Sequence, residues 1–174
     1  MADLTLLERL QPSLLDRLVD DQPHRRQESR DDRVLSMGRL RQAVQRDLAW
    51  LLNTVNLEAT DDLGEYPLVA RSVLNFGLPD LTGLPSSSLD PVMLERVVRQ
   101  AIWDFEPRIS RHTVKVRVAT DRNAMSHNAL TFYIEGELWA QPTPIRLYLK
   151  SEIDLEIGQI RVSGANANDS PGLS

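Results

Sequence analysis

The sequence predicts an α+β fold, in which N-terminal helices precede an antiparallel β-meander that packs against them. Two patterns support this. Apolar residues recur every three or four positions between residues 36 and 105, and they alternate with polar residues from residue 114 onward. The 174 residues, 41% hydrophobic and 26% charged, fit one domain with tails. We expect a leucine-rich docking segment and charged linker over 1–33, an α+β domain over 34–162 and a disordered tail over 163–174.

Leucines dominate the start of the chain, at positions 4, 6, 7, 10, 14, 15 and 18. Pro12 interrupts their pattern, and Ser13 can cap a short helix over Leu14-Leu15-Asp16-Arg17-Leu18. Two interpretations stay open: this helix folds onto the core of the chain, or it is an apolar tag that docks on another chain. Residues 20–33 are mostly charged, and we expect a linker there because they cannot bury enough surface to order themselves.

The first long helix is expected over Ser36 to Asn53, where six apolar residues make one face: Met37, Leu40, Val44, Leu48, Leu51 and Leu52. A short helix is expected over Pro67 to Asn75, with Val69, Val73 and Leu74 directed inward. Gly77 is expected to supply a left-handed conformation where that helix ends. Residues 80–89 are rich in Gly, Pro and Ser, which predicts a loop.

The second long helix begins at Asp90-Pro91, because Asp is a favoured N-cap and Pro is favoured at the first helical position. Its expected inward face consists of Leu94, Val98, Ala101, Ile102 and Phe105. The helix runs directly into Glu106-Pro107.

Beyond residue 113 the apolar period changes to two. The alternation covers 114–118, 130–138 and 145–150, and it continues with the same parity over 152–157. Each of these segments predicts a strand with one face on a core and one face in solvent. Asp121-Arg122-Asn123 and Gln141-Pro142-Thr143-Pro144 predict turns, and 160–162 predicts a last short strand.

Composition excludes several classes of function. A net charge of −5 argues against nucleic-acid binding driven by phosphate attraction. The chain has no cysteine, which excludes disulfides and thiolate chemistry, and its three histidines are not spaced as metal ligands. We therefore expect no cofactor and no metal. The first residues do not resemble a secretory signal and no apolar run could span a bilayer, so we expect a cytoplasmic protein without direct membrane insertion.

The tripeptide Glu106-Pro107-Arg108 places an acid and a base around a proline, at the boundary between the helical and the alternating region. Pro107 cannot continue a helix, and it favours extended geometry at Glu106. Arg108 offers a planar fork that suits carboxylates. The pair can cap the helix and tie its end to the first strand, or it can face a partner chain, and the two roles are compatible.

Catalysis is the alternative interpretation, with Glu106 as the general acid of a peptidoglycan hydrolase. Glycoside hydrolysis needs two carboxyl groups across the sugar. Asp104 is the nearest acid, but residues two apart on a helix point away from each other. Folding could bring Glu135 or Glu137 close, but nothing in the sequence requires it. Arg108 favours the ionised form of its neighbour, whereas a general acid must carry a proton. The catalytic signal is therefore weak, and we expect no enzymatic activity.

Four short motifs, in order between residues 12 and 160, resemble the baseplate family of contractile tails that carries a lysozyme-like name. The resemblance is to its TssE branch, the baseplate subunit of the bacterial type VI secretion system. The motifs are Leu14-Leu15-Asp16-Arg17-Leu18, Arg46-Asp47-Leu48 with Leu51-Leu52-Asn53-Thr54, Ser72-Val73-Leu74-Asn75-Phe76-Gly77-Leu78-Pro79-Asp80, and Glu106-Pro107-Arg108.

This resemblance implies a small α+β structural protein that binds the wedge subunits TssF and TssG and initiates assembly of the contractile sheath of TssB and TssC. TssK is a further implied partner. Assembly would take place on the inner face of the cell envelope. The Glu-Pro-Arg motif would stabilise the baseplate contacts from which the sheath grows. We expect Leu14, Leu15, Asp16, Arg17 and Leu18 to dock on the wedge, Glu106, Pro107 and Arg108 to fix a corner against a partner, and a sheet edge to accept a sheath strand.

Overall fold

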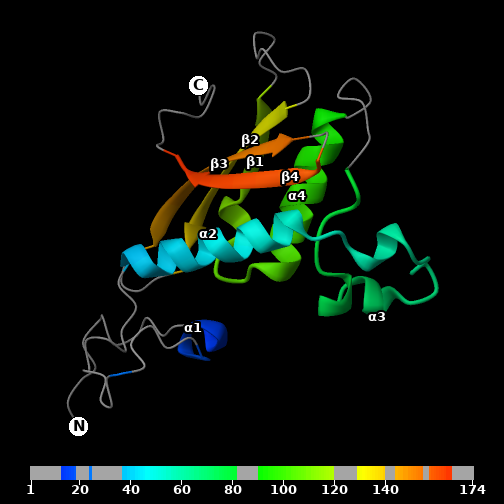
Figure 1. Cartoon of the computed structure of the whole chain (residues 1–174), viewed down its shortest axis with the longest axis horizontal. Helices are drawn as coiled ribbons and strands as arrows, with labels where there is room; N and C mark the ends of the chain where they lie inside the picture. Colours follow the sequence, from blue (N-terminus) through cyan, green and yellow to red (C-terminus); the bar gives the residue numbers. More distant parts are fainter. Residues whose placement is uncertain are drawn as a thin grey trace.

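The structure is a computed structural model that describes residues 13–18, 24, 37–81, 90–119, 129–139, 144–154 and 157–165, without the side chains of Arg17 and Ala129. Helices come first along the chain and a four-stranded sheet follows, so the predicted α+β class is confirmed (Figure 1). The helices and 3₁₀ turns are α1 (Leu14–Leu18), α2 (Met37–Asn53), η2 (Leu57–Ala59), α3 (Pro67–Ala70), η3 (Val73–Asn75), α4 (Pro91–Phe105) and η5 (Arg111–Thr113). The strands are β1 (Lys115–Ala119), β2 (Ala129–Leu138), β3 (Ile145–Asp154) and β4 (Gln159–Gly164).

The two long helices form where the apolar period of three to four predicts them. Helix α4 begins as expected: the Asp90 carboxylate accepts a hydrogen bond from the Val92 N–H, and Pro91 occupies the first turn. On α2 the buried side chains are Leu40, Ala43, Val44, Leu48, Leu51 and Leu52. Met37 was expected on this inward face but is exposed, because it is the first residue of the helix and lies beyond the edge of the core.

The sheet is an antiparallel meander in which the strands pair in chain order, β1-β2-β3-β4. The alternation of the sequence sets the register. Phe132 lies opposite Val118 on one side and Ser151 on the other, and all three side chains are directed to the same face. Because a shift of one residue would turn every apolar side chain outward, the pattern fixes the pairing.

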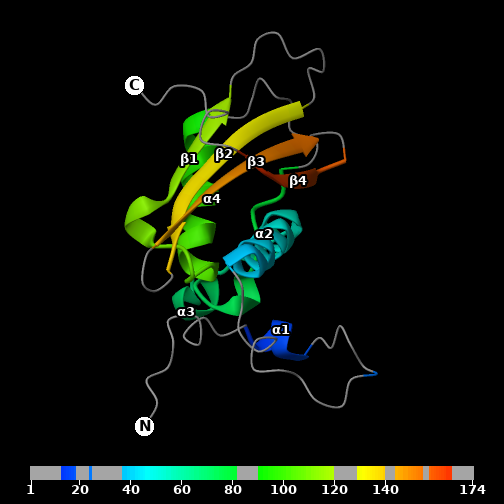
Figure 2. The ribbon, with the colours of Figure 1, turned by 90° about the vertical axis from the view of Figure 1, so that its left-hand side faces the viewer.

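Helices α2 and α4 cover one face of this sheet (Figures 1 and 2), and their buried residues form a single core with the inward residues of all four strands. Helix α1 lies apart from the sheet, below α2 in both views. None of the helices in the described ranges has the length and apolar character needed to cross a membrane.

Two expectations about individual segments were wrong. Val73 and Leu74 were expected inside a helix over Pro67 to Asn75, but they are 79% and 67% exposed. The segment forms the short α3 and then η3, and Asn75 is buried instead because its side chain bonds to Glu58 N and Ala70 O. Ile157 was expected to continue a strand, but β3 ends at Asp154 and Ile157 lies 64% exposed in the turn before β4.

Gly77 adopts a φ of +129°, as the sequence suggested for a left-handed position. The main reason is a close approach of two backbone segments. A Cβ at this position would lie 2.3 Å from the Thr54 carbonyl oxygen. Leu78 N donates to that same oxygen at 2.8 Å, and Asn56 N donates to Leu78 O. Thr54, the residue after α2, is thereby hydrogen-bonded to Leu78, which lies in the segment that leads toward α4.

Several predictions fall outside the described residues. These are the linker over 20–33 apart from His24, the loop over 82–89, the turns at 121–123 and 141–143, and the tail beyond Ala165. The last strand extends two residues past the boundary that was expected at residue 162.

Candidate functional site

Glu106 ends α4 and turns the chain toward the sheet. Its N–H still donates to Ile102 O at 2.9 Å, while its φ of −121° and ψ of 76° depart from the helix. Pro107 follows and stops the helix, as expected. Beyond it, Arg108 O accepts a hydrogen bond from Trp139 N at 2.7 Å, and Ser110 N donates to Glu137 O at 2.9 Å. The tripeptide is therefore a corner, and its backbone attaches to the end of β2 instead of the first strand.

The side chains of the tripeptide bond to each other. Arg108 Nε lies 2.7 Å from Glu106 Oε1, and Arg108 Nη2 lies 2.5 Å from Oε2, so the fork of the guanidinium spans both carboxylate oxygens. The Arg108 N–H also donates to Oε1 at 3.1 Å. Glu106 is only 4% exposed. A carboxylate at this depth needs such partners, because a buried charge without them is strongly destabilising.

A second acid extends the pair into α2. Arg108 Nη2 lies 2.6 Å from Asp47 Oδ2, and the other oxygen of Asp47 accepts a hydrogen bond from Arg46 Nε at 2.9 Å. Arg46 also contacts α1, since its Nη1 lies 2.8 Å from Asp16 Oδ1. Ser13 Oγ donates to the second oxygen of Asp16 at 2.6 Å and accepts from the Asp16 N–H, which caps the first turn of α1.

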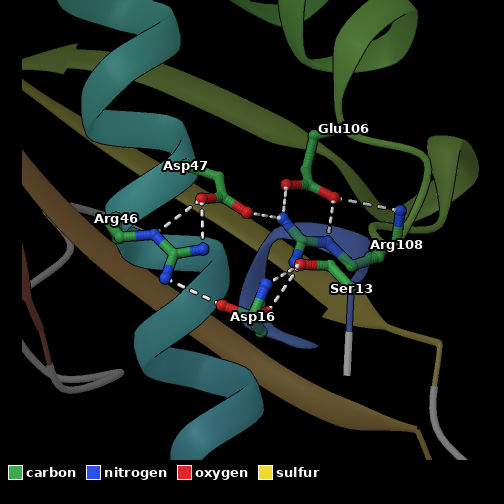
Figure 3. Close-up of polar contacts among 6 residues, drawn as sticks. All are labelled: Ser13, Asp16, Arg46, Asp47, Glu106 and Arg108. Atoms are coloured by element: carbon green, nitrogen blue, oxygen red, sulfur yellow. Dashed lines mark hydrogen bonds and ion pairs between the residues drawn. The ribbon is translucent and has the colours of Figure 1, made fainter. Parts of the chain in front are cut away.

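These six residues form one continuous chain of hydrogen bonds and ion pairs, here called the relay: Ser13, Asp16, Arg46, Asp47, Arg108 and Glu106 (Figure 3). The relay connects α1, α2 and the corner after α4. Its burial differs from residue to residue: the exposed side-chain fraction is 4% at Glu106, 26% at Arg108, 23% at Asp47, 35% at Arg46 and 14% at Asp16.

Three groups of the relay have shifted pKa values, Arg108, Arg46 and Asp16, and each shift favours the charged form. Burial acts to lower the pKa of Arg108, but the hydrogen bonds and charges of Glu106 and Asp47 outweigh it and raise the pKa. The hydrogen bond to Asp47 likewise raises the pKa of Arg46. Burial acts to raise the pKa of Asp16, but the hydrogen bond from Ser13 and the charge of Arg46 lower it below its ordinary value. These arginine and aspartate charges therefore stabilise one another.

A cavity of about 230 Å³ adjoins the relay. Its wall is mainly apolar, and the relay residues Asp47, Glu106 and Arg108 form one side of it. The apolar lining consists of Leu15, Leu48, Trp50, Leu51, Phe76 and Phe105. Its volume lies below the ~300 Å³ at which typical small-molecule pockets begin. Leu15 of α1 contributes to the wall, so the cavity lies where α1 adjoins α2 and the end of α4.

One side of helix α1 contacts the rest of the protein, and the other side faces solvent. Leu15 is partly covered at 43% exposure, whereas Leu14 and Leu18 are 73% and 74% exposed. Residues four apart lie on the same face of a helix, so Leu14 and Leu18 form one exposed apolar pair. Of the residues predicted to bind a partner, the structure thus brings Leu15, Asp16, Glu106 and Arg108 to one site. Pro107 is exposed at the corner, and the side chain of Arg17 lies outside the described residues.

Sequence reasoning missed the connecting role of Arg46 and Asp47. Both stand in a motif that the resemblance singled out, but neither was assigned a contact. The available signal was an acid beside a base on α2 just before the buried Leu48. An acid next to a base in the sequence does not indicate which distant side chain the acid contacts.

The chain matches the family model for the baseplate wedge protein gp25 over residues 38–143, more than half of its length. The chain belongs to this family. TssE is the type VI secretion homologue of gp25, so the family resemblance of the motifs is confirmed. The matched residues include α2, α4 and the corner, and therefore the relay from Arg46 to Glu106. A search of the curated proteins found no match, and neither did a search of the solved structures. This wedge protein is a structural component of a phage-like baseplate and assembles with other baseplate proteins.

Proposed function

We propose that this wedge protein is a non-enzymatic baseplate subunit of a type VI secretion system, which binds TssF and TssG and initiates polymerisation of the TssB–TssC sheath. The observation that carries the proposal is the inward-bonded corner at Glu106-Pro107-Arg108 in a member of the gp25 family. An initiator has to hold the growing polymer in a fixed orientation. A corner that clamps α4, α2 and the end of β2 together supplies that rigidity.

The wedge contact is assigned to α1. Its exposed pair, Leu14 and Leu18, is suited to an apolar groove on another chain, and an exposed apolar pair on a short helix gains little in the isolated protein. The relay fixes the orientation of this pair, because Asp16 is bonded to Arg46 while Leu15 lies at the cavity.

The absence of catalysis is argued from Glu106 itself. All the hydrogen bonds described for its carboxylate come from Arg108, and the side chain is almost fully buried. A general acid must be protonated and must reach the substrate oxygen. Glu106 in this setting is the anion of an ion pair. The nearest acid in the relay, Asp47, shares the same guanidinium and does not face Glu106 across an open space for a sugar.

Sheath assembly in cells tests the proposal. Glu106→Ala and Arg108→Ala are expected to leave a folded monomer but to abolish fluorescent sheaths. Val44→Ala is the matched control, because it removes buried apolar volume from α2 and lowers stability by a comparable amount without touching the relay. Normal sheaths in either relay variant would refute the proposal. Sheath loss in proportion to the fall in melting temperature, in all three variants, would reduce the corner to a stabilising cap.

Wedge binding has its own test. Leu14→Asp with Leu18→Asp is expected to abolish copurification with TssF and TssG, whereas Leu68→Asp, at another highly exposed leucine, should retain it. A purified cell-wall suspension provides the counter-test for hydrolysis. Loss of turbidity that Glu106→Gln abolishes would favour the hydrolase instead.

A further inference from the structure

Between α2 and the segment that leads to α4, residues 55–81 form a unit of short turns, here called the lobe, which contains η2, α3 and η3. In Figure 1 the lobe lies beyond the C-terminal end of α2, whereas α1 lies beneath the middle of that helix. The surface of the lobe is therefore distinct from the exposed leucine pair of α1.

The lobe exposes apolar side chains and buries polar ones. Val73 and Leu74 on η3 are exposed, whereas the next residue, Asn75, is buried. Apolar area in contact with water is unfavourable, so the isolated chain gains nothing from this arrangement. Such a surface is typical of a binding site. Five large apolar side chains of the lobe are more than half exposed: Val55, Tyr66, Leu68, Val73 and Leu74.

Two buried asparagines fix the backbone that carries these side chains. Asn75 Oδ1 accepts a hydrogen bond from Glu58 N at 2.9 Å, and Asn75 Nδ2 donates to Ala70 O at 2.9 Å. One side chain thus joins η3 to both η2 and α3. Asn56 Oδ1 accepts from Ala59 N at 3.2 Å and caps η2. The exposed apolar residues are held on a preorganised framework, which lowers the entropy cost of binding a partner.

The lobe also carries most of the net negative charge of the chain. It contains five acids and one base, so four of the five net negative charges lie in this segment. All six charged residues are exposed. Because Asn75 bonds to Glu58 N, the acidic η2 lies beside the apolar η3. The acids are Glu58, Asp61, Asp62, Glu65 and Asp80, and the base is Arg71.

This charge selects the class of partner. A second copy of the chain would bring two acidic lobes face to face, and nucleic acid or an anionic membrane would be repelled. The turns of η2, α3 and η3 close backbone hydrogen bonds within the lobe, so an incoming chain meets side chains and not a strand edge. An amphipathic helix suits such a surface, because it presents an apolar face with charged residues along its sides.

We propose that the lobe is a docking surface for an amphipathic helix of another baseplate chain, with apolar residues that contact Val73 and Leu74 and with Lys or Arg along its flanks. The exposed ring of Tyr66 is available to one of these cations. This contact goes beyond the proposed function, because it uses neither α1 nor the corner and requires only that the wedge protein assembles with other baseplate proteins.

A designed peptide tests this chemistry on the full chain. A helical peptide with leucines on one face and lysines on both flanks should bind, and its analogue with glutamates on the flanks should bind at least about tenfold more weakly. Val73→Ser with Leu74→Ser should weaken binding of the lysine peptide by about tenfold or more. The control is Val92→Ser with Met93→Ser, an exposed apolar pair at the start of α4, which should leave binding unchanged. Equal binding of the two peptides, or equal losses in the two variants, would overturn the proposal.

Neutralising the acids tests the role of charge separately. Glu58→Gln with Glu65→Gln should weaken binding of the lysine peptide by about fivefold and reduce its dependence on salt. Glu135→Gln with Glu152→Gln, which removes two acids from strands β2 and β3, should leave both properties unchanged. The same change in both variants would show that the acids of the lobe do not select a basic partner.

The N-terminal leucines of the chain are the competing occupant of the lobe. Deletion of residues 1–12 should leave binding of the lysine peptide unchanged, because the proposal assigns the lobe to another chain. A gain in affinity of about tenfold after the deletion would show that the chain covers its own lobe, and would overturn that assignment.

Sheath assembly in cells measures whether the contact is used. Val73→Ser with Leu74→Ser should reduce sheath formation at least about tenfold while leaving the melting temperature and copurification with TssF and TssG unchanged, since these side chains are exposed and lie outside α1. The variant with Val92→Ser and Met93→Ser should form sheaths normally. Normal sheaths in the lobe variant would overturn the proposal. If deletion of the whole chain leaves sheaths intact, the proposed function fails instead, and the peptide measurements still decide whether the lobe binds a basic helix.

Discussion

Arg108 reaches back 61 positions along the chain to place its Nη2 2.6 Å from Asp47 Oδ2. That contact joins the corner after α4 to the middle of α2, and the same guanidinium neutralises the buried Glu106. A single side chain therefore links the two helices that cover one face of the sheet.

Removal of this side chain should be costly. Arg108→Ala is expected to lower the free energy of unfolding by about 2–4 kcal/mol, because it leaves the charge of Glu106 buried without a partner. Arg108→Lys should lose a large part of the same energy, since an ammonium cannot span both carboxylate oxygens. Urea denaturation measures both, with Arg96→Ala on the exposed side of α4 as the control. Equal stability of Arg108→Ala and Arg96→Ala would contradict the role assigned to the relay.

Docking of α1 should depend on pH. The folded-state pKa of Asp16 is lowered, so its stabilising contribution is fully present above the ordinary range of about 4 and is lost as the pH falls through the folded value. A spin label at Leu18→Cys should therefore be ordered at neutral pH and mobile in acid. With Asp16→Asn added, the label should already be mobile at neutral pH. A label whose mobility does not change between neutral and acid pH would show that the ion pair with Arg46 does not hold α1.

Gly77→Ala should destabilise the fold by at least about 2 kcal/mol, because a Cβ there would overlap the Thr54 carbonyl and the φ is positive. Gly64→Ala is the control, since its Cβ would meet only the flexible side chain of Asp62. Thermal unfolding of the two variants checks the difference. Similar melting temperatures would mean that the backbone at Gly77 can move away.

Ser151 offers a change in the opposite direction. Its hydroxyl is fully buried, and no hydrogen-bond partner for it exists among the described residues. Ser151→Ala should therefore raise the free energy of unfolding by about 1 kcal/mol, since it removes an unsatisfied polar group from the core. Ser163→Ala, at an exposed position of β4, should stay within about 0.5 kcal/mol of the unmodified chain. A loss of stability in Ser151→Ala would point to an unseen partner.

The sequence predicted those features that depend on local periodicity. The strand faces around Phe132 and Leu149 follow from a period of two, and the start of α4 follows from Asp90-Pro91. Local pattern failed at Val73 and Leu74, because a helix over Pro67 to Asn75 was expected and the chain instead makes two short turns around the buried Asn75.

The site was predicted only in part for a different reason. Glu106 and Arg108 are neighbours in the chain, so their pairing could be anticipated. Asp47 meets them only because α2 and α4 pack on the same sheet face, and no spacing in the sequence reports that packing. The same holds for Asn53, which reads as an ordinary helix exit until Ile160 is found 2.8 Å away.

The two ion pairs that Arg46 makes are more exposed than the ion pair of Arg108 with Glu106. Mobile ions screen exposed charge pairs far more than buried ones. Rising ionic strength should therefore weaken the bonds of Arg46 to Asp16 and Asp47 more than the bond between Arg108 and Glu106. Salt should therefore loosen the attachment of α1 to α2 while the corner after α4 stays closed.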